Sequence, residues 1–192
     1  TLSDFNTIVS TWDFKELEAI YNRTRKKSYW LDYYDYLDHS LFLKPLFIFL
    51  LMEDYKLVLQ FINHYYEKLY SLPIFITPLV LMELIAYIEL EYQDEFEYKI
   101  RNFQYLLKKN KLNSIYIKQV LSFLSKDFLY LKNPTKKMIL RFNKLYNSTS
   151  ESKEYSSEYF IDSISFSFFE CYLKSKINNK TIFDTYQLEF NL

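Results

Sequence analysis

The sequence predicts an all-α fold, a compact antiparallel bundle of about nine helices that forms one domain over residues 1–192. The chain contains no glycine, so the tight turns of β-hairpins lose their preferred residue. Long segments place apolar residues three and four positions apart, which is typical of helices. Hydrophobic residues make up 49% of 192 residues, enough for one sizeable core. Stacked helical-repeat hairpins stay an open alternative, although no repeat of matching residues recurs.

Four helices are expected in the first 70 residues. Thr11 is a candidate N-cap for the first, whose acidic residues come early and basic residues late, as the helix dipole favours. The third carries Pro45 in its first turn, a position that tolerates proline. The fourth shows Leu57, Phe61 and Tyr65 on one stripe. The expected ranges are Asp13–Lys27, Tyr29–His39, Leu43–Met52 and Asp54–Tyr70.

Five further helices are expected after residue 72. The first of them is apolar nearly all round, as a central helix is. The next two carry regular apolar stripes, for example Phe96, Ile100 and Phe103. Pro134 opens the fourth. The expected ranges are Pro73–Glu91, Asp94–Lys109, Ser114–Leu131, Pro134–Tyr146 and Tyr159–Ile177.

The last of these segments has two possible periods. Ile164–Phe168 alternates apolar and polar residues like a strand, but only over five residues. A helical stripe runs from Ile161 to Cys171 and continues beyond it. The longer pattern favours a helix, and the tail from Asn178 to Leu192 is expected to be irregular.

Composition excludes several classes of protein. Without glycine the chain cannot form the Gly-x-Gly-x-x-Gly nucleotide loop, the P-loop or the nucleophile elbow. One cysteine, Cys171, and two histidines, His39 and His64, leave no disulfide and no cysteine metal cluster. Polar residues interrupt every apolar run before it reaches membrane-spanning length. We therefore expect no enzyme, no catalytic residue, no metal, no cofactor, no membrane partner and a cytoplasmic location.

Charge is distributed in blocks along a chain of zero net charge. Residues 28–97 contain three basic and twelve acidic residues, a net charge of −9, whereas residues 98–146 contain twelve basic residues and one acidic residue, a net charge of +11. The two blocks either neutralise each other across the bundle or form a bipolar surface that attracts a charged partner.

The acidic block contains a candidate partner-binding patch. Its first three acids, Asp32, Asp35 and Asp38, stand three residues apart, and His39 follows them. On a helix this spacing allows two of the carboxylates, but not all three, to share a metal ion. Packing of the intervening tyrosines, with the acids outward, is therefore favoured over a metal site. The patch comprises Asp32, Asp35, Asp38, Glu91, Asp94, Glu95 and Glu97, and its candidate aromatic anchors are Tyr33, Tyr36, Tyr92 and Tyr98.

The basic block supports an alternative function. Lys137, Arg141 and Lys144 fall on one helical face, where they would suit a helical scaffold or a nucleic-acid-associated module. The aromatic residues of this block sit at core spacing, and the isoelectric point near 6.7 lacks the usual basic signature. Nucleic acid is therefore the less favoured partner.

Two parts of the chain carry a family resemblance. Residues 29–66 and 73–87 form an aromatic-rich helix, an apolar helix and a helix pair, and the C-terminal third has Phe168-Phe169-Glu170 followed by Phe183-Asp184 and Tyr186. In order and spacing these features resemble bacterial polymorphic-toxin immunity proteins, in particular the helical PoNi-like family that protects cells from a DNase effector. The family's Gly and Trp before the Phe-Glu step and the proline of its tail are absent. The resemblance implies a cytoplasmic helical protein that neutralises a cognate toxin by stoichiometric binding, without catalysis.

Overall fold

The computed structural model describes residues 14–26, 28, 30, 43–71, 73–109, 121–125, 133–138, 140–141, 144 and 157–189. The helices given bounds there are α2 (Phe14–Thr24), α4 (Leu43–Leu51), α5 (Tyr55–His64), α6 (Tyr66–Tyr70), α7 (Pro73–Glu89), α8 (Gln93–Lys109), α11 (Ser157–Asn178) and α12 (Ile182–Glu189). The described residues contain no strand, which confirms the all-α class. Most of the helix expected over Tyr29–His39, apart from Trp30, and most of the one expected over Ser114–Leu131 lie outside these ranges.

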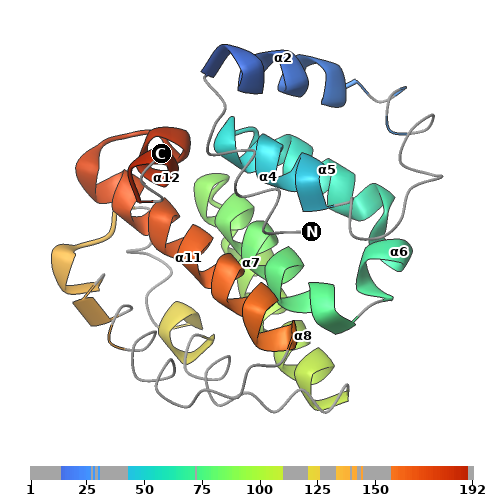
Figure 1. Cartoon of the computed structure of the whole chain (residues 1–192). Helices are drawn as coiled ribbons and strands as arrows, with labels where there is room; N and C mark the ends of the chain where they lie inside the picture. Colours follow the sequence, from blue (N-terminus) through green and yellow to red (C-terminus); the bar gives the residue numbers. More distant parts are fainter. Residues whose placement is uncertain are drawn as a thin grey trace.

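Helix α7 is the centre of the bundle, as its nearly uniform apolar character predicts. It packs against α4, α5, α6, α8 and α11, and every side chain from residue 76 to residue 86 is buried. In Figure 1, α11 crosses in front of α7, α2 lies over α4 and α5, and α12 lies beside α11. Helices such as α5 and α8 bury one face and expose the other, whereas α4 is buried on nearly all sides.

Aromatic side chains join the N-terminal helices. The ring centroids of Trp30 and Phe61 lie 5.1 Å apart, and those of Phe49 and Phe61 lie 5.8 Å apart. Trp30 Nε1 donates a hydrogen bond of 2.5 Å to the carbonyl of Thr24, and the Tyr65 hydroxyl donates one of 2.7 Å to the carbonyl of Trp30. These contacts tie the end of α2 to α4 and α5.

Two expectations about helix boundaries are wrong. The segment Asp54–Tyr70 is not one helix, because it breaks at Tyr65 (φ −106°, ψ 20°), the residue whose hydroxyl binds Trp30. The C-terminal tail is not irregular but forms α12. Its start is stabilised by Thr181 Oγ1, which accepts a 3.0 Å hydrogen bond from the Asp184 N–H, and its Ile182, Phe183 and Tyr186 side chains are buried.

Three helices end in Schellman motifs without glycine. Glu53, Glu91 and Asn179 have positive φ angles of 56°, 62° and 52°. At the end of α7, for example, the Tyr92 N–H donates to the carbonyl of Tyr87 and the Glu91 N–H to that of Ile88. A left-handed conformation costs a non-glycine residue roughly 1–2 kcal/mol, so each of these ends carries strain.

We predict that Glu91→Gly raises the free energy of unfolding by about 0.5–1 kcal/mol, since glycine adopts this conformation freely. Urea denaturation followed by circular dichroism measures the change. Glu53→Gly is the matched comparison: Glu53 Oε1 accepts a 3.1 Å hydrogen bond from the Ile182 N–H at the start of α12, and this variant loses it. An equal gain in stability in both variants would show that the hydrogen bond between Glu53 and Ile182 does not stabilise the fold.

Candidate functional site

Four of the predicted acidic residues lie at one end of α8, and we call them the acidic surface: Glu91, Asp94, Glu95 and Glu97. All four are exposed. Asp94 and Glu95 stand in the first turn of α8, where the helix dipole stabilises a carboxylate by about 0.3–1 kcal/mol. Glu97 Oε1 accepts a 3.1 Å hydrogen bond from Gln93 Nε2, one turn earlier. The other predicted residues lie outside the described part of the chain: Asp32, Asp35, Asp38, Tyr33 and Tyr36.

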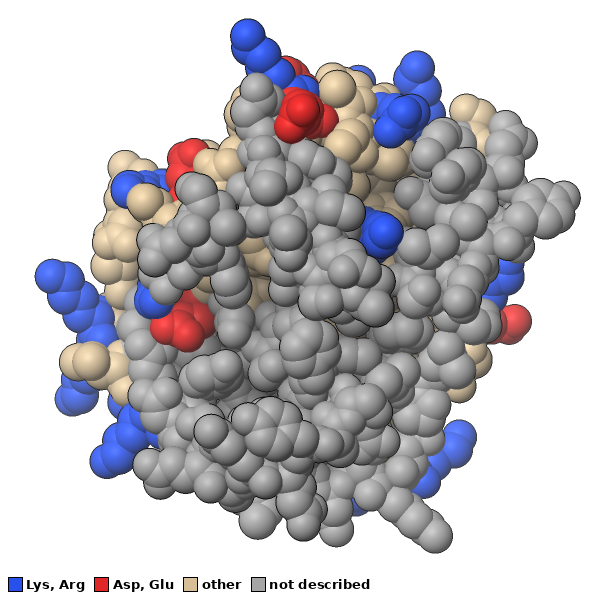
Figure 2. Space-filling model, viewed as in Figure 1, with Lys and Arg blue, Asp and Glu red and all other residues tan. Residues whose placement is uncertain are grey.

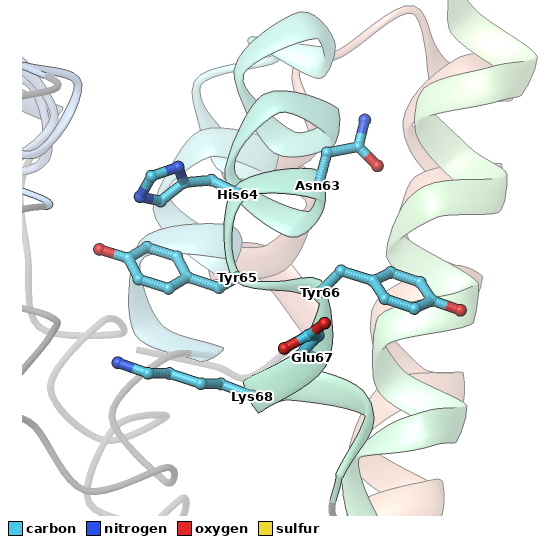
Figure 3. A pocket seen from close by; sticks show the side chains of 6 residues that line it. All are labelled: Asn63, His64, Tyr65, Tyr66, Glu67 and Lys68. Carbon is cyan, nitrogen blue, oxygen red and sulfur yellow. The ribbon is translucent and has the colours of Figure 1, made fainter.

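Exposed tyrosines accompany these acids. Tyr92 and Tyr98, both predicted as aromatic anchors, are 42% and 65% exposed. Two further tyrosines were missed, Tyr105 at 61% and Tyr66 at 43%. Tyr105 was identifiable, because it follows Tyr98 by two turns on the side of α8 opposite Phe96. The exposure of Tyr66 was not identifiable from the sequence. Tyr65 and Tyr66 point in opposite directions at the helix break, which the sequence does not predict (Figure 3).

A buried ion pair fixes α8 on α7. Lys99 Nζ pairs with Glu83 Oε2, and the two side chains are only 7% and 3% exposed. The Tyr70 hydroxyl donates a hydrogen bond to the same carboxylate oxygen of Glu83. The Lys99 ammonium also lies 4.6 Å from the ring centroid of Tyr70 and 5.9 Å from that of Tyr66. Three helices, α6, α7 and α8, thus meet at one carboxylate.

Burial dominates the electrostatics of this cluster. It raises the pKa of Glu83 above its ordinary range, although the charge of Lys99 and the hydrogen bonds from Lys99 and Tyr70 act in the opposite direction. Burial also raises the pKa of Tyr70 well above its ordinary value, and the nearby charge of Glu83 raises it further. The phenol therefore stays neutral and acts as a hydrogen-bond donor.

A second polar cluster joins α7 to α11. The Tyr172 hydroxyl donates a 2.7 Å hydrogen bond to Glu89 Oε1, and Lys176 Nζ lies 2.9 Å from Glu89 Oε2. Burial, followed by the charge of Glu89, raises the pKa of Tyr172 well above its ordinary value. The nearby Tyr55 hydroxyl is buried and has no hydrogen-bond partner among the described residues. Both clusters connect helices inside the bundle, and Lys176 of the second cluster also lines an open surface hollow formed with Glu53 and residues 179–181.

The residues of the alternative basic face are exposed. Lys137, Arg141 and Lys144 all reach solvent, and the Arg141 guanidinium carbon lies 5.6 Å from the ring centroid of Phe123. On the face shown in Figure 2, the described Lys and Arg side chains project separately around the margin, several of them with acidic groups nearby. Mutual neutralisation of the two charge blocks holds for Lys99 and Glu83. The rest of that alternative stays open.

The histidine and the cysteine of the described residues do not form a catalytic pair. His64 lies at the exposed end of α5, 4.6 Å from the ring of Tyr65 and 6.2 Å from that of Trp30, beside a shallow hollow lined by residues 63–68 (Figure 3). Cys171 is buried in α11. Within the described ranges, no group of three or more His, Cys, Asp or Glu side chains is placed to hold a metal ion. None of the helices described is long and apolar enough to span a bilayer.

Glu170, the acid of the Phe-Glu step, is half-buried at the rim of α11. Its Oε1 lies 3.0 Å from Lys174 Nζ, one turn further along the same helix. The preceding Phe168 and Phe169 are buried in the core. The two phenylalanines therefore pack in the core, and Glu170 forms an ion pair on the surface of α11.

Comparison of the chain with protein-family models, with curated proteins and with solved structures gives no match.

We predict that Lys99→Met lowers the free energy of unfolding by about 3–5 kcal/mol, because it leaves the buried Glu83 carboxylate without its cation. Urea denaturation measures the loss. Lys108→Met, a change of the same kind at an exposed position of α8, is expected to cost less than about 0.5 kcal/mol. In the double variant with Glu83→Gln, which removes the buried charge but keeps an oxygen that accepts from the Tyr70 hydroxyl, most of the lost stability is expected to return. If it does not, Lys99 contributes packing alone.

We also predict that stability falls as the pH rises above about 10. The pKa of Tyr70 and that of Tyr172 are raised in the folded protein, so at high pH the unfolded chain releases protons that the folded chain keeps. Each such tyrosine lowers the free energy of unfolding by about 1.4 kcal/mol per pH unit in this window. Denaturation at a series of pH values tests this. Tyr172→Phe should flatten the slope, because it removes one of the two phenols.

Proposed function

We propose that this protein is a cytoplasmic immunity protein that binds a cognate, DNase-type toxin in a stoichiometric complex and neutralises it without catalysis. The observation that carries the proposal is the acidic surface at the start of α8, flanked by the exposed Tyr92 and Tyr98. The order of features along the sequence, which resembles the PoNi-like family, supports the same function.

The charge of the acidic surface suits a cationic partner. A DNase domain needs positive charge around its substrate site, because it binds phosphate groups. Carboxylates grouped on a neighbouring protein imitate that phosphate charge, accelerate association and favour the correct orientation. Glu91, Asp94, Glu95 and Glu97 provide such a group at one end of a single helix.

The tyrosines suit the same contact. Tyr and Trp are enriched among the residues that dominate binding energy at interfaces, since they bury much area with few rotatable bonds. Tyr98 is 65% exposed while the opposite face of α8 is fixed by Phe96, Ile100 and Phe103 in the core. The helix therefore presents its side chains with little loss of conformational entropy on binding.

The experiment uses the product of a toxin-like gene adjacent to the gene for this chain. We expect one equivalent of this protein to abolish its DNA cleavage, and titration calorimetry to give a 1:1 complex. A triple variant, Asp94→Asn with Glu95→Gln and Glu97→Gln, is expected to associate at least about tenfold more slowly at low salt. Stopped-flow fluorescence measures this rate.

Glu16→Gln with Glu18→Gln, on the exposed face of α2, is the control for a loss of acidic charge elsewhere. Both variants need a circular dichroism spectrum, because each removes at least one carboxylate from the first turn of a helix. The loss of each such carboxylate costs about 0.3–1 kcal/mol of stability. Equal inhibition by the triple variant and the wild type would exclude the acidic surface as the docking site. Failure of the wild type to inhibit would exclude the function for that toxin.

The alternative, a nucleic-acid-associated module that uses residues 98–146, gives a different result. It requires binding of DNA or RNA by this protein alone, with an affinity that falls steeply as salt is added. Loss of that binding in Lys137→Glu and Lys144→Glu would favour the alternative.

A further inference from the structure

Helix α8 carries an outer stripe that the described part of the chain leaves exposed. Asp94, Tyr98, Arg101 and Tyr105 follow each other at steps of four, three and four residues, and all four are exposed. At about 100° per residue these positions fall within roughly 60° of one another around the helix. The core-facing side of α8, which includes Phe96 and Phe103, lies opposite.

The composition of the outer stripe is unlike that of a solvated helix face. Such a face usually carries charged and small polar residues, whereas two of these four residues are tyrosines that are 65% and 61% exposed. Steps of four, three and four residues are also the spacing at which one helix packs along another. Tyrosine and arginine are the residue types enriched where proteins meet.

The order of the groups makes the stripe complementary to itself. Along the chain it reads acid, tyrosine, arginine, tyrosine. When a second copy of α8 runs in the opposite direction, Asp94 lies opposite Tyr105 of the second copy, and Tyr98 lies opposite Arg101 of the second copy. A carboxylate accepts a hydrogen bond from a phenol, and a guanidinium binds the face of an aromatic ring. Two-fold symmetry forms each contact twice.

The ends of α8 favour the same direction. The helix begins with the acidic Asp94 and Glu95 and ends with the basic Lys108 and Lys109. An antiparallel pair brings the acidic start of one copy near the basic end of the other. A parallel pair would place like charges side by side, which is unfavourable.

We propose that two copies of this protein associate through an antiparallel pair of α8 helices, in the register that sets Asp94 against Tyr105 and Tyr98 against Arg101. The shared segment from residue 94 to residue 105 is about 16 Å long. An interface of this length lies at the small end of specific protein contacts, so the dimer is weak and dissociates on dilution.

This inference does not rest on the proposed function, although the two contacts share Asp94 and Tyr98. Toxin and second copy therefore exclude each other, and the dimer hides part of the acidic surface until a cationic partner competes for it. Arg101→Gln separates the two contacts, because it removes a group of the outer stripe and leaves every carboxylate in place. It should weaken the dimer and leave toxin binding intact.

Sedimentation velocity over a wide concentration range measures the dimer. Tyr98→Ala is expected to raise its dissociation constant at least about tenfold. Gln104→Ala, at an exposed position about 90° away from the stripe, should leave the constant unchanged. A wild-type protein that stays monomeric at all concentrations, or a dimer insensitive to Tyr98→Ala, would overturn the proposal.

Cysteine cross-linking tests the direction and the register. Asp94→Cys and Tyr105→Cys are prepared separately, with Cys171 buried and out of reach. Under mild oxidation the mixture of the two variants should form a disulfide-linked dimer, and neither variant alone should do so, because like positions lie far apart in an antiparallel pair. Cross-linking of either variant with itself would show a different register and contradict the proposed pair.

Discussion

The central helix α7 is buried along almost its whole length, yet it carries two carboxylates that need cations. Glu83 and Glu89 are six residues apart, so they point about 120° away from each other around the helix axis. One recruits Lys99 from α8, and the other recruits Tyr172 and Lys176 from α11. A buried charge without a partner costs several kcal/mol, so each neighbour must dock in the orientation that supplies its cation or hydroxyl. Apolar packing alone would allow these helices to slide or rotate.

This internal constraint reaches the surface through α8. Turning Lys99 inward toward Glu83 also determines which residues of α8 face solvent. Tyr98 and Arg101, on either side of Lys99, are turned outward as a consequence. The acidic surface and the outer stripe therefore belong to a helix whose rotation about its own axis is set by contacts in the core. The contacts of Lys99 with the rings of Tyr66 and Tyr70 also restrict this rotation.

Most of the secondary structure follows from sequence periodicity, while the errors arise where distant residues decide. The uniform apolarity of α7 predicted its central position, and the long stripe from Ile161 to Cys171 correctly predicted a helix for α11. The break at Tyr65 depends on a hydrogen bond to Trp30, 35 residues away. The helical tail depends partly on Glu53, which no local pattern connects with Ile182.

The site was partly predictable for the same reason. Exposure of Asp94, Glu95, Glu97 and Tyr98 follows from the amphipathic pattern of α8. The same pattern implied Tyr105, which was overlooked. Burial of Lys99 could not be predicted, because a lysine at the edge of an apolar face ordinarily reaches solvent. Only its meeting with Glu83 in three dimensions makes burial favourable.

The contact between Glu53 and Ile182 spans 129 residues, and that between Glu89 and Tyr172 spans 83. On a ribosome, the N-terminal helices emerge long before the C-terminal segments that complete their polar contacts. Until α11 and α12 arrive, the apolar surfaces of α7 and α4 that they cover are exposed to water and to other chains. The nascent protein is therefore most prone to aggregation between the synthesis of α7 and that of α11 and α12, and these helices close onto it only when nearly all of these 192 residues have been made.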